Sequence, residues 1–428
     1  MKPKEGDKIR INTGGEAEVL RKLGEGGQGV VFEVAYSGKN YALKWYHKPA
    51  SDKFYDNLKS NIEKGAPDGH FLWPLFLTAK DQDGCFGYLM ELRDPAYREF
   101  GDFLLAKTSF KTVGAMIEAA IHICAGFRML HTKGFSYQDL NDGNFFINPE
   151  NGNVLICDND NVAPYGDNTG ILGKCRYMAP EVVRGEKRPD IRSDSFSLAV
   201  ILFMLFFNNH PLEGARVSQC ACMTEKNEKE LYGNKPLFIY DPKDKSNRPV
   251  PGIHTNVLNL WGQYPQYVRD MFCKVFSQES LRDPEIRITE KQWIEDMLLP
   301  LRHDRIICPA CHHEIFIEPI STFVCGDCRR PIHQLPRLKV GKYSVAPCAG
   351  KWVHGYITEN NGQLMNVRAQ FVESKKTPGL FGLKNLTERK WMLTTKSGST
   401  RDIAPGEAAP MLVGNQLAFG NGFTAEIA

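Results

Sequence analysis

Apolar and polar residues alternate on both sides of a cluster of glycines in residues 17–45, AEVLRKLGEGGQGVVFEVAYSGKNYALKW. An alternation with a period of two is the pattern of β-strands that bury one face. Because the alternation resumes directly after the glycines, at residues 30–34, a strand follows them, whereas a dinucleotide-binding fold requires a helix there. Residues 24–29 therefore favour a hairpin that closes over phosphate groups, and a tight turn without a ligand is the alternative.

Lys44 stands in the apolar strand that follows this hairpin. A lysine at such a position is costly to bury unless an anion meets its ammonium group, and an edge strand with that group in water is the alternative. A helix is predicted over residues 52–64, because its apolar residues recur at a spacing of four: Phe54, Leu58 and Ile62. Glu63 in this helix is a candidate carboxylate partner for Lys44.

The chain changes from strand-like to helical at about residue 112. Two further strands are predicted around residues 71–79 and 85–92, and residues 213–256 are a polar excursion. Apolar periodicity predicts helices in three segments: 112–134, 257–278 and 289–301. Strands first and helices later indicate an α+β fold with a small β-rich lobe and a larger helical lobe.

A loop of acids and amides, YQDLNDGN at residues 137–144, carries the strongest chemical signal. It keeps the Asp and the Asn of the protein kinase catalytic loop, H-R-D-L-x-x-x-N, as Asp139 and Asn144. Asp158 follows an apolar strand, where the family has the Asp of D-F-G. With the glycine loop and Lys44 ahead of these residues in the kinase order, the chain resembles a protein kinase.

The resemblance extends past the catalytic loop and covers about residues 15–301. Met178–Glu181, MAPE, matches the A-P-E motif, and Asp283–Arg287, DPEIR, matches the late D-P-x-x-R motif. In kinases that arginine pairs with the glutamate of A-P-E. The resemblance therefore implies a structural ion pair between Arg287 and Glu181.

The resemblance implies a bilobal kinase fold that binds ATP with Mg²⁺ or Mn²⁺. Lys44 would hold the α- and β-phosphates, Glu63 would orient Lys44, and Asp139 would orient the acceptor hydroxyl. Asn144 and Asp158 would supply oxygen ligands to the metal. The implied nucleotide-binding residues are Gly24, Gly26, Gly29, Val31, Ala42, Lys44 and Glu63, with Met90 at the gatekeeper position and Glu91 and Leu92 in the hinge.

Several residues depart from the family pattern. Tyr137 and Gln138 replace the His and Arg of H-R-D, which argues against activation by phosphorylation of the activation segment. Asn159 and Asp160 replace the Phe and Gly of D-F-G.

The departure with the largest consequence for catalysis is Asn141. It replaces the lysine that Ser/Thr kinases place two residues after the catalytic Asp to steady the transferring phosphoryl group. Lys174, ahead of the A-P-E motif, is a candidate to return this charge from the opposite side. A solvated loop lysine is the equally weighted alternative.

Four of the twelve cysteines are paired in the sequence: Cys308 with Cys311 and Cys325 with Cys328. Two C-x₂-C pairs place four thiolates where they can surround one ion, and zinc fits best. The closed set of four thiolates predicts a structural zinc ribbon at residues 304–334, with two disulfides or free thiols as the alternative. Three nearby histidines exceed the four ligands and are treated as surface residues: His312, His313 and His333.

The other eight cysteines are scattered, which favours a reducing compartment and predicts a cytoplasmic protein. The longest apolar run, Leu198–Phe207, has ten residues, too few to span a bilayer, and predicts a helix buried on all sides. No membrane partner is expected. The formal charge of +3, with only Arg329 and Arg330 near the ribbon, argues against nucleic-acid binding, whose signature would be a steep salt dependence.

Residues 335–428 show short strand-like runs separated by Gly, Asn and Pro, and predict an all-β domain. Residues 384–428 are weakly similar to the last strands of a forkhead-associated β-sandwich. Such domains bind phosphothreonine through an Arg and a Ser, and Arg368 and Ser374 do not stand in that motif. A docking β-sandwich without phosphate recognition is favoured.

Together these features predict an ATP-dependent Ser/Thr protein kinase in residues 1–303, with the ribbon and the β-domain contacting protein substrates and signalling partners. The arrangement is similar to bacterial kinases of tellurite-resistance-type phosphorylation systems. A nucleotide-binding pseudokinase that scaffolds partner proteins is the alternative. Asn141, Gln138 and the altered D-F-G favour the pseudokinase, whereas the intact catalytic residues disfavour it: Lys44, Asp139, Asn144 and Asp158.

Overall fold

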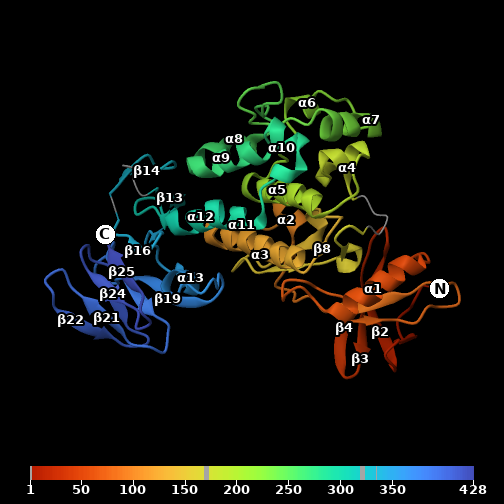
Figure 1. Cartoon of the computed structure of the whole chain (residues 1–428), viewed down its shortest axis with the longest axis horizontal. Coiled ribbons are helices and arrows are strands. Elements are labelled where there is room, and N and C mark those ends of the chain that lie inside the picture. Colours follow the sequence, from red (N-terminus) through yellow and green to blue (C-terminus); the bar gives the residue numbers. More distant parts are fainter. Residues whose placement is uncertain (1, 168–172, 319–322, 334) are drawn as a thin grey trace. The chain divides into compact units, whose positions relative to one another are not determined.

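The computed structural model describes residues 2–167, 173–318, 323–333 and 335–428. The chain forms two compact units (Figure 1). Unit 1 comprises Met1–Lys111, Ala115–Trp261 and Arg269–Glu295. Unit 2 comprises Thr112–Gly114, Gly262–Val268 and Asp296–Ala428.

Unit 1 begins with a six-stranded antiparallel sheet in the order β1-β2-β3-β4-β6-β5. Its strands are β1 Lys8–Arg10, β2 Glu16–Glu25, β3 Gly29–Tyr36, β4 Lys39–Tyr46, β5 Phe76–Leu77 and β6 Gly87–Glu91. β2 and β3 form a hairpin around residues 26–28, as the alternation predicts. β3 and β4 turn at Ser37 and Gly38, whose φ angles are 49° and 79°. A residue in this left-handed region is typical of two-residue hairpin turns.

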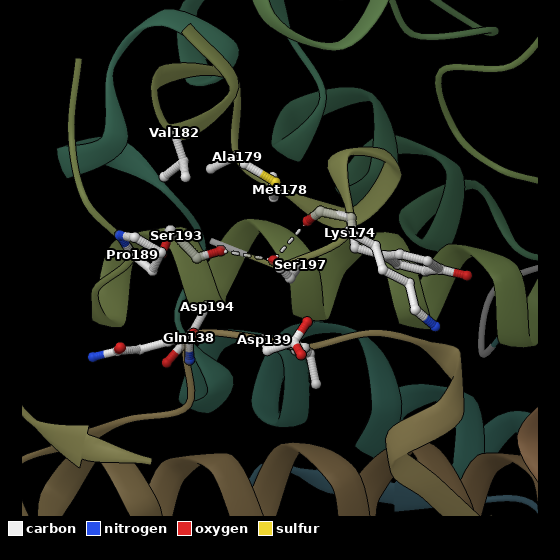
Figure 2. A pocket seen from close by; sticks show the side chains of 13 residues that line it. Gln138, Asp139, Lys174, Met178, Ala179, Val182, Pro189, Ser193, Asp194 and Ser197 are labelled. Carbon is white, nitrogen blue, oxygen red and sulfur yellow. Dashed lines mark hydrogen bonds between the residues drawn. The ribbon is translucent and has the colours of Figure 1, made fainter. Parts of the chain in front are cut away.

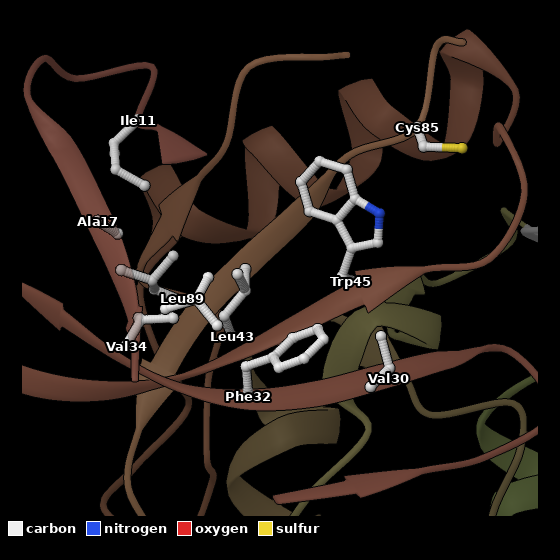
Figure 3. Close-up of a cluster of buried hydrophobic side chains, with 10 residues drawn as sticks. Ile11, Ala17, Val30, Phe32, Val34, Leu43, Trp45, Cys85 and Leu89 are labelled. Atoms are coloured by element: carbon white, nitrogen blue, oxygen red, sulfur yellow. The ribbon is translucent and has the colours of Figure 1, made fainter. Parts of the chain in front are cut away.

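One face of this sheet is buried in a hydrophobic cluster (Figure 3). The cluster includes Val30, Phe32 and Val34 of β3, Leu43 and Trp45 of β4, and Leu89 of β6. Because side chains alternate along a strand, the intervening residues Val31, Ala42 and Lys44 lie on the opposite face. Val31 and Lys44 are direct cross-strand partners there. The alternation that builds the core therefore also sets the face on which the lysine lies.

Helix α1, Asp52–Lys64, matches the predicted range. The hydroxyl of Ser51 caps it by accepting a hydrogen bond from the backbone N–H of Phe54 at 3.2 Å. The helix ends at Gly65, whose φ is 74°. Leu58 packs into a second cluster against β6, whereas Glu63 is exposed.

The helical part of unit 1 surrounds α5, Ile191–Phe207. The carboxylate of Asp190 caps this helix by accepting hydrogen bonds from the backbone N–H groups of Arg192 and Ser193 at 2.8 and 2.9 Å. All residues from Ser193 to Phe207 are buried, so the helix is enclosed on all sides, as its apolar run predicts.

Helix α3, Val113–Thr132, is long and apolar enough to cross a membrane, but 67% of its apolar stretch is buried inside the protein. It is therefore a core helix. The chain leaves it through Gly134 with φ 78°, where the predicted helix also stops.

The remaining helices are short: α2 Phe100–Leu104, α4 Pro180–Arg184, α6 Ala215–Ser218, α7 Glu225–Glu228, α8 Thr255–Leu260, α9 Gln266–Val275, α10 Gln278–Arg282, α11 Glu290–Gln292 and α12 Leu299–Asp304. The single helix predicted at 257–278 is instead broken into α8, a 3-10 turn, α9 and α10. Pro265 precedes α9 and lacks the N–H that a continuous helix requires. The polar excursion at 213–256 contains α6, α7 and a π-helical turn, Lys229–Asn234.

Short strand pairs hold the two loops that carry the acids. β8 Phe135–Ser136 pairs with β11 Ala163–Pro164, and β9 Phe145–Ile147 pairs with β10 Val154–Ile156 and β7 Arg98–Glu99. Residues 137–144 lie between β8 and β9, and residues 157–162 lie between β10 and β11. Because β8 pairs with β11, the start of the first loop lies beside the end of the second. Because β9 pairs with β10, the end of the first loop lies beside the start of the second.

Unit 2 contains two short hairpins with the paired cysteines, followed by two antiparallel sheets. β12 Arg305–Ile307 pairs with β13 Glu314–Phe316, and β14 Phe323–Val324 pairs with β15 Pro331–Ile332. The sheets have the orders β17-β16-β25-β24-β21-β22 and β18-β19-β20-β23.

Residues 338–427 supply all strands of these two sheets. The elements are β16 Leu338–Val340, β17 Tyr343–Val345, β18 Trp352–His354, α13 Gly355–Thr358, β19 Val367–Glu373, β20 Phe381–Asn385, β21 Trp391–Thr394, β22 Thr400–Ile403, β23 Ala408–Pro410, β24 Gln416–Ala418 and β25 Thr424–Ile427. Arg368 on β19 pairs with Glu359 at 3.0 Å, and Ser374 accepts a hydrogen bond from the N–H of Thr377 at 3.2 Å. Both side chains thus have local structural contacts.

Candidate active site

A cleft of about 1180 Å³ in unit 1 collects most of the residues that the sequence singles out. The predicted residues that line it are Gly24, Gly26, Gly29, Val31, Ala42, Lys44, Met90, Glu91, Leu92, Asp139, Asp158 and Lys174. The glycine hairpin, β4, the end of β6 and both acidic loops thus face one space. Glu63 and Asn144 do not line it.

Close packing requires a glycine at only one position in the hairpin motif. A Cβ atom on Gly29 would lie 2.4 Å from the backbone oxygen of Trp45 on the neighbouring strand. No atom lies within 4 Å of a Cβ added at Gly24, Gly26 or Gly27. Gly29 therefore permits the close approach of β3 and β4, while the other glycines leave room over the cleft.

Asp194 of α5 fixes the backbone of the loop at residues 137–144. The N–H groups of Tyr137 and Gln138 donate to the carboxylate of Asp194 at 2.6 and 3.0 Å. Gln138 has a φ of 72°, an unfavourable conformation for a non-glycine residue that such contacts maintain. The Tyr137 hydroxyl donates to the backbone oxygen of Cys157, which ties this loop to the Asp158 loop.

The carboxylate of Asp139 projects beside two amides. The side-chain N–H₂ groups of Asn141 and Asn161 lie 3.3 and 3.5 Å from its oxygens. Burial raises the pKa of Asp139, and the charge of Lys174 and the hydrogen bond from Asn141 act in the opposite direction. This carboxylate is held in place by weak donors and can still accept a hydrogen bond from an incoming hydroxyl.

Asn144 and Asp158 are the residues from which the sequence predicts oxygen donors for a metal. Asn144 is buried, and its side-chain oxygen accepts a hydrogen bond from the N–H of Asn141 at 2.6 Å, which leaves one lone pair of that oxygen. Asp158 has left-handed angles, φ 55° and ψ 42°, and its side chain is 46% exposed. A carboxylate and an amide oxygen are ligands that suit Mg²⁺, so the donor set fits this ion.

The ammonium group of Lys44 contacts residues other than Glu63, its predicted partner. Its Nζ lies 2.8 Å from Asp160 Oδ2 and 3.4 Å from both Asp158 Oδ1 and Gln28 Oε1. Glu63, the predicted partner, is exposed in the last turn of α1. Leu58 and Asn61 are the buried positions of α1, so Glu63 projects from another side of the helix.

Lys174 reaches the catalytic loop from the activation segment. Its Nζ donates to Asn141 Oδ1 at 2.8 Å and lies 3.7 Å from Asp142 Oδ1. A positive charge is thus present beside Asn141, and the role of Lys174 in phosphoryl transfer stays a prediction. Lys174 is 62% exposed on its side chain, so it also faces solvent.

A shallow pocket adjoins Asp139 on the side of the A-P-E segment (Figure 2). Gln138, Asp139 and Lys174 supply its polar side, and Met178, Ala179, Val182 and Pro189 supply apolar carbon. The hydroxyl of Ser197 lies 2.7 Å from the backbone oxygen of Tyr177 and fixes the segment to α5.

The predicted pair between Arg287 and Glu181 is confirmed. Two guanidinium nitrogens donate to the two carboxylate oxygens at 2.7 Å each, and both side chains are buried. Arg287 also donates to the backbone oxygen of Arg192 at 3.0 Å. Such a bidentate pair fixes the A-P-E segment against α5.

The four paired cysteines of unit 2 gather at one point. Their sulfur atoms lie within 4.8 Å of one another, with Cys308 and Cys328 at 3.8 Å and Cys311 and Cys325 at 3.6 Å. A tetrahedral zinc with Zn–S bonds of about 2.3 Å separates its sulfurs by about 3.8 Å, whereas a disulfide requires about 2.05 Å. The spacing of the sulfurs therefore fits a four-thiolate metal site and is longer than the bond of a disulfide.

The two cysteine hairpins share one backbone geometry. The residue after each second cysteine is left-handed, with φ 62° at His312 and 59° at Arg329. The N–H of each of these residues donates to the backbone oxygen of the first cysteine of its pair, at 2.9 and 3.0 Å. His313 is exposed and pairs with Asp327 at 2.8 Å.

Sequence reasoning missed Asp160 and Gln28 as partners of Lys44. The available signal for Asp160 was an acid where the family motif has glycine. The sequence contained no comparable signal for Gln28, because it lies among glycines whose hairpin geometry alone turns its side chain toward β4.

Comparison with known proteins agrees with this geometry. A sequence model of the protein kinase domain matches residues 17–299. Protein kinase YegI of Escherichia coli (strain K12) is 24% identical over 318 residues, which is 67% of this chain and 45% of that protein. Protein kinase C delta type of Mus musculus is 27% identical over 205 residues, which is 45% of this chain and 29% of that protein.

A plant relative has a similar sequence identity to this chain. The serine/threonine-protein kinase AtPK2/AtPK19 of Arabidopsis thaliana is 24% identical over 219 residues, which is 46% of this chain and 43% of that protein. The chain spans less than half the length of each of these three relatives.

Proposed function

The chain belongs to the protein kinase family, and from this premise we propose that it transfers the γ-phosphate of Mg-ATP to Ser or Thr hydroxyls of protein substrates. The observation that carries the proposal is the convergence of Lys44, Asp139 and Asp158 with the glycine hairpin on one cleft. Preference for Ser and Thr rests on the resemblance and on relatives that carry that name.

Each residue has a role that its position permits. Asp139 orients the acceptor hydroxyl and accepts its proton, because its carboxylate faces the cleft and the side-chain donors beside it, among the described residues, are the weak ones of two amides. Asp158 and Asn144 would hold Mg²⁺, which neutralises phosphate charge when bound. Lys44 contacts the phosphates, and Lys174 adds positive charge next to Asn141.

A second candidate function is a nucleotide-binding scaffold without phosphoryl transfer. It is favoured by the residues that depart from the family pattern: Asn141 stands in place of the loop lysine, Gln138 in place of the arginine of H-R-D, and Asn159 and Asp160 in place of the Phe and Gly of D-F-G.

Transfer from labelled ATP to the protein itself and to a generic protein substrate distinguishes the two functions. We expect phosphoserine or phosphothreonine to form, and we expect Asp139→Asn or Asp158→Ala to lower the rate about a hundredfold or more. Asp56→Ala removes an exposed carboxylate from α1 and is the matched control that leaves the rate unchanged. Nucleotide binding by wild-type protein without any transfer would support the scaffold.

For unit 2 we propose a structural zinc ion and docking of protein partners, in a reducing cytoplasm that keeps the thiols free. All twelve cysteines are free thiols in the structure, and four of them have the spacing of zinc ligands. Elemental analysis is expected to give one zinc per chain. Cys311→Ser is expected to lose it and Cys222→Ser, an exposed cysteine elsewhere, to retain it. A metal-free wild-type protein purified under reducing conditions would contradict this assignment.

A further inference from the structure

None of the sequence motifs identified Asp160 as a partner of Lys44. Its Oδ2 accepts hydrogen bonds from the Lys44 ammonium at 2.8 Å and from the Tyr46 hydroxyl at 2.5 Å. We propose that Asp160 is the positioning residue of Lys44 and that it performs the task that the family pattern gives to a carboxylate of helix α1. The inference rests on the proposed kinase function, and Glu63 has no part in it.

Burial makes the contact between these two groups strong. The side chain of Asp160 is 0% exposed and that of Lys44 is 7% exposed, so water competes little for either charge. An ion pair in this setting is maintained only when its geometry is close and further hydrogen bonds support it. The Tyr46 hydroxyl supplies part of that support, since it donates to the same oxygen of Asp160, whereas the other oxygen, Oδ1, is buried without a hydrogen-bond partner among the described residues.

The three contacts of the Lys44 ammonium group differ in length, which distinguishes a partner that stays in place from two that a phosphate oxygen can replace. The contact with Asp160 is 2.8 Å, whereas those with Asp158 and Gln28 are 3.4 Å. Asp158 is 46% exposed and Gln28 lies on the glycine hairpin. A phosphate oxygen that enters the cleft can replace either long contact and leave the short one intact.

Strand pairing and hydrogen bonds hold the backbone of both Lys44 and Asp160 in place. Lys44 and Tyr46 are two residues apart on β4 and face the same side of the sheet. Asp160 lies in a 3-10 turn whose Asn159 donates hydrogen bonds to the backbone oxygens of Leu72 and Ile156 at 2.9 Å each.

Helix α1 contacts this support at two places. The ring of Phe54 packs against that of Tyr46 with centroids 5.5 Å apart, and the side-chain N–H₂ groups of Asn57 and Asn61 donate to the backbone oxygen of Val162 at 2.9 and 2.8 Å. The contribution of α1 is therefore packing and backbone support, whereas the carboxylate that meets the Lys44 ammonium is that of Asp160.

Steady-state kinetics of two carboxylate-to-amide variants provides the first test. Asp160→Asn is expected to lower kcat by about ten- to a hundredfold, because Lys44 loses its fixed position, while KM for ATP changes by less than about threefold. Glu63→Gln, the matched change on α1, is expected to leave both constants unchanged. Tyr46→Phe removes only the supporting hydrogen bond and should show a smaller fall in kcat.

A second readout does not require turnover. An amine-directed N-hydroxysuccinimide ester modifies the neutral amine, and mass spectrometry measures modification of Lys44 in the absence of nucleotide. Asp160→Asn is expected to raise the rate at Lys44 several-fold, Asp158→Asn by less, and Glu63→Gln not at all. The exposed Lys48 in the same proteins is the internal standard for reagent dose and should react equally in all of them, and circular dichroism reports whether the fold is retained.

The two readouts separate this proposal from the kinase assignment. If Glu63→Gln reproduces the effects, or if Asp160→Asn leaves the modification of Lys44 at the wild-type rate, Asp160 does not position Lys44. If the wild-type protein transfers no phosphate, the kinase assignment fails, and the modification rates still decide which carboxylate holds Lys44. Should Asp160→Asn not fold, Tyr46→Phe gives the same comparison on a folded protein.

Discussion

Two buried lysines, one in each unit, show what surrounding groups do to the same side chain. Lys44 in unit 1 is 6% exposed and meets the carboxylates of Asp160 and Asp158. Lys351 in unit 2 is 4% exposed and donates to the backbone oxygens of His303 and Ala346 at 2.9 and 2.6 Å.

The two environments move the pKa in opposite directions. Burial, with further repulsion from Arg305, lowers the pKa of Lys351 well below 10.5, and the neutral oxygens that it meets do not compensate. Carboxylates reverse this outcome at Lys44. A buried lysine is thus a reliable cation only where the fold delivers an acid to it, and in this chain that occurs in the cleft.

The largest expected effect comes from removing the charge at Lys44. Lys44→Met is expected to lower phosphoryl transfer about a hundred- to a thousandfold, because the cleft loses a fixed positive charge. It also leaves Asp160 buried without its ion-pair partner, which should lower the free energy of unfolding by about 3 kcal/mol. Kinetics and denaturant unfolding measure these effects. Lys48→Met, at an exposed lysine just beyond β4, should change neither.

His131, whose side chain is 8% exposed, sharpens the comparison through its pH dependence. His131 lies between Asp194 at 3.1 Å and Glu290 at 2.8 Å. Burial lowers its pKa, but the hydrogen bonds with these two carboxylates raise it from 6.5 to about 9. Because the folded state binds the proton more tightly, the stabilisation is complete below pH 6.5 and is lost as the pH rises through 9.

His131→Gln therefore should destabilise the protein by roughly 3 kcal/mol at pH 6 and far less at pH 10. Denaturant unfolding at several pH values measures the difference from wild type. His333→Gln, an exposed histidine, is the control and should show no such trend. A difference that is the same at pH 6 and pH 10 would mean that His131 stabilises by packing alone.

The smallest effect is expected at Lys351, and its trend is opposite. The unfolded chain binds a proton at this lysine below 10.5 and the folded protein releases it, so the contribution of Lys351 to stability rises with pH up to that value. Lys351→Met should change the free energy of unfolding at pH 7 by about 1 kcal/mol and should remove the rising trend. Lys342→Met, at an exposed lysine of the same unit, should leave it unchanged.

Local pattern predicted much of unit 1. The alternation in residues 17–45 defined β2, β3 and β4, and the spacing of Phe54, Leu58 and Ile62 defined α1. The same spacing contained the reason why Glu63 fails as a partner. If Leu58 and Ile62 face the core, the next residue projects about 100° away from them.

Contacts between distant segments were predicted less well. Asp160 lies 116 residues after Lys44, and contacts between segments far apart in the sequence fix its loop, such as the hydrogen bonds from Asn159 to Leu72 and from Asn61 to Val162. For Lys174 the sequence supported two equally weighted interpretations, a replacement for the charge missing at Asn141 and a solvated lysine, and did not predict its 2.8 Å contact with Asn141. The broken helix at 257–278 was missed because the apolar period continues across turns that interrupt the hydrogen bonding.

We expect neighbouring glycines of the hairpin to be required for different reasons, one for folding and the others for nucleotide binding. Gly29 is needed by the fold itself, because any side chain there would collide with the backbone of Trp45. Gly26 and Gly27 have open space above them, so a larger residue at either position costs the folded chain little. A library scored for thermal resistance should therefore accept variation at 26 and 27, and only a library scored for nucleotide occupancy should reject it.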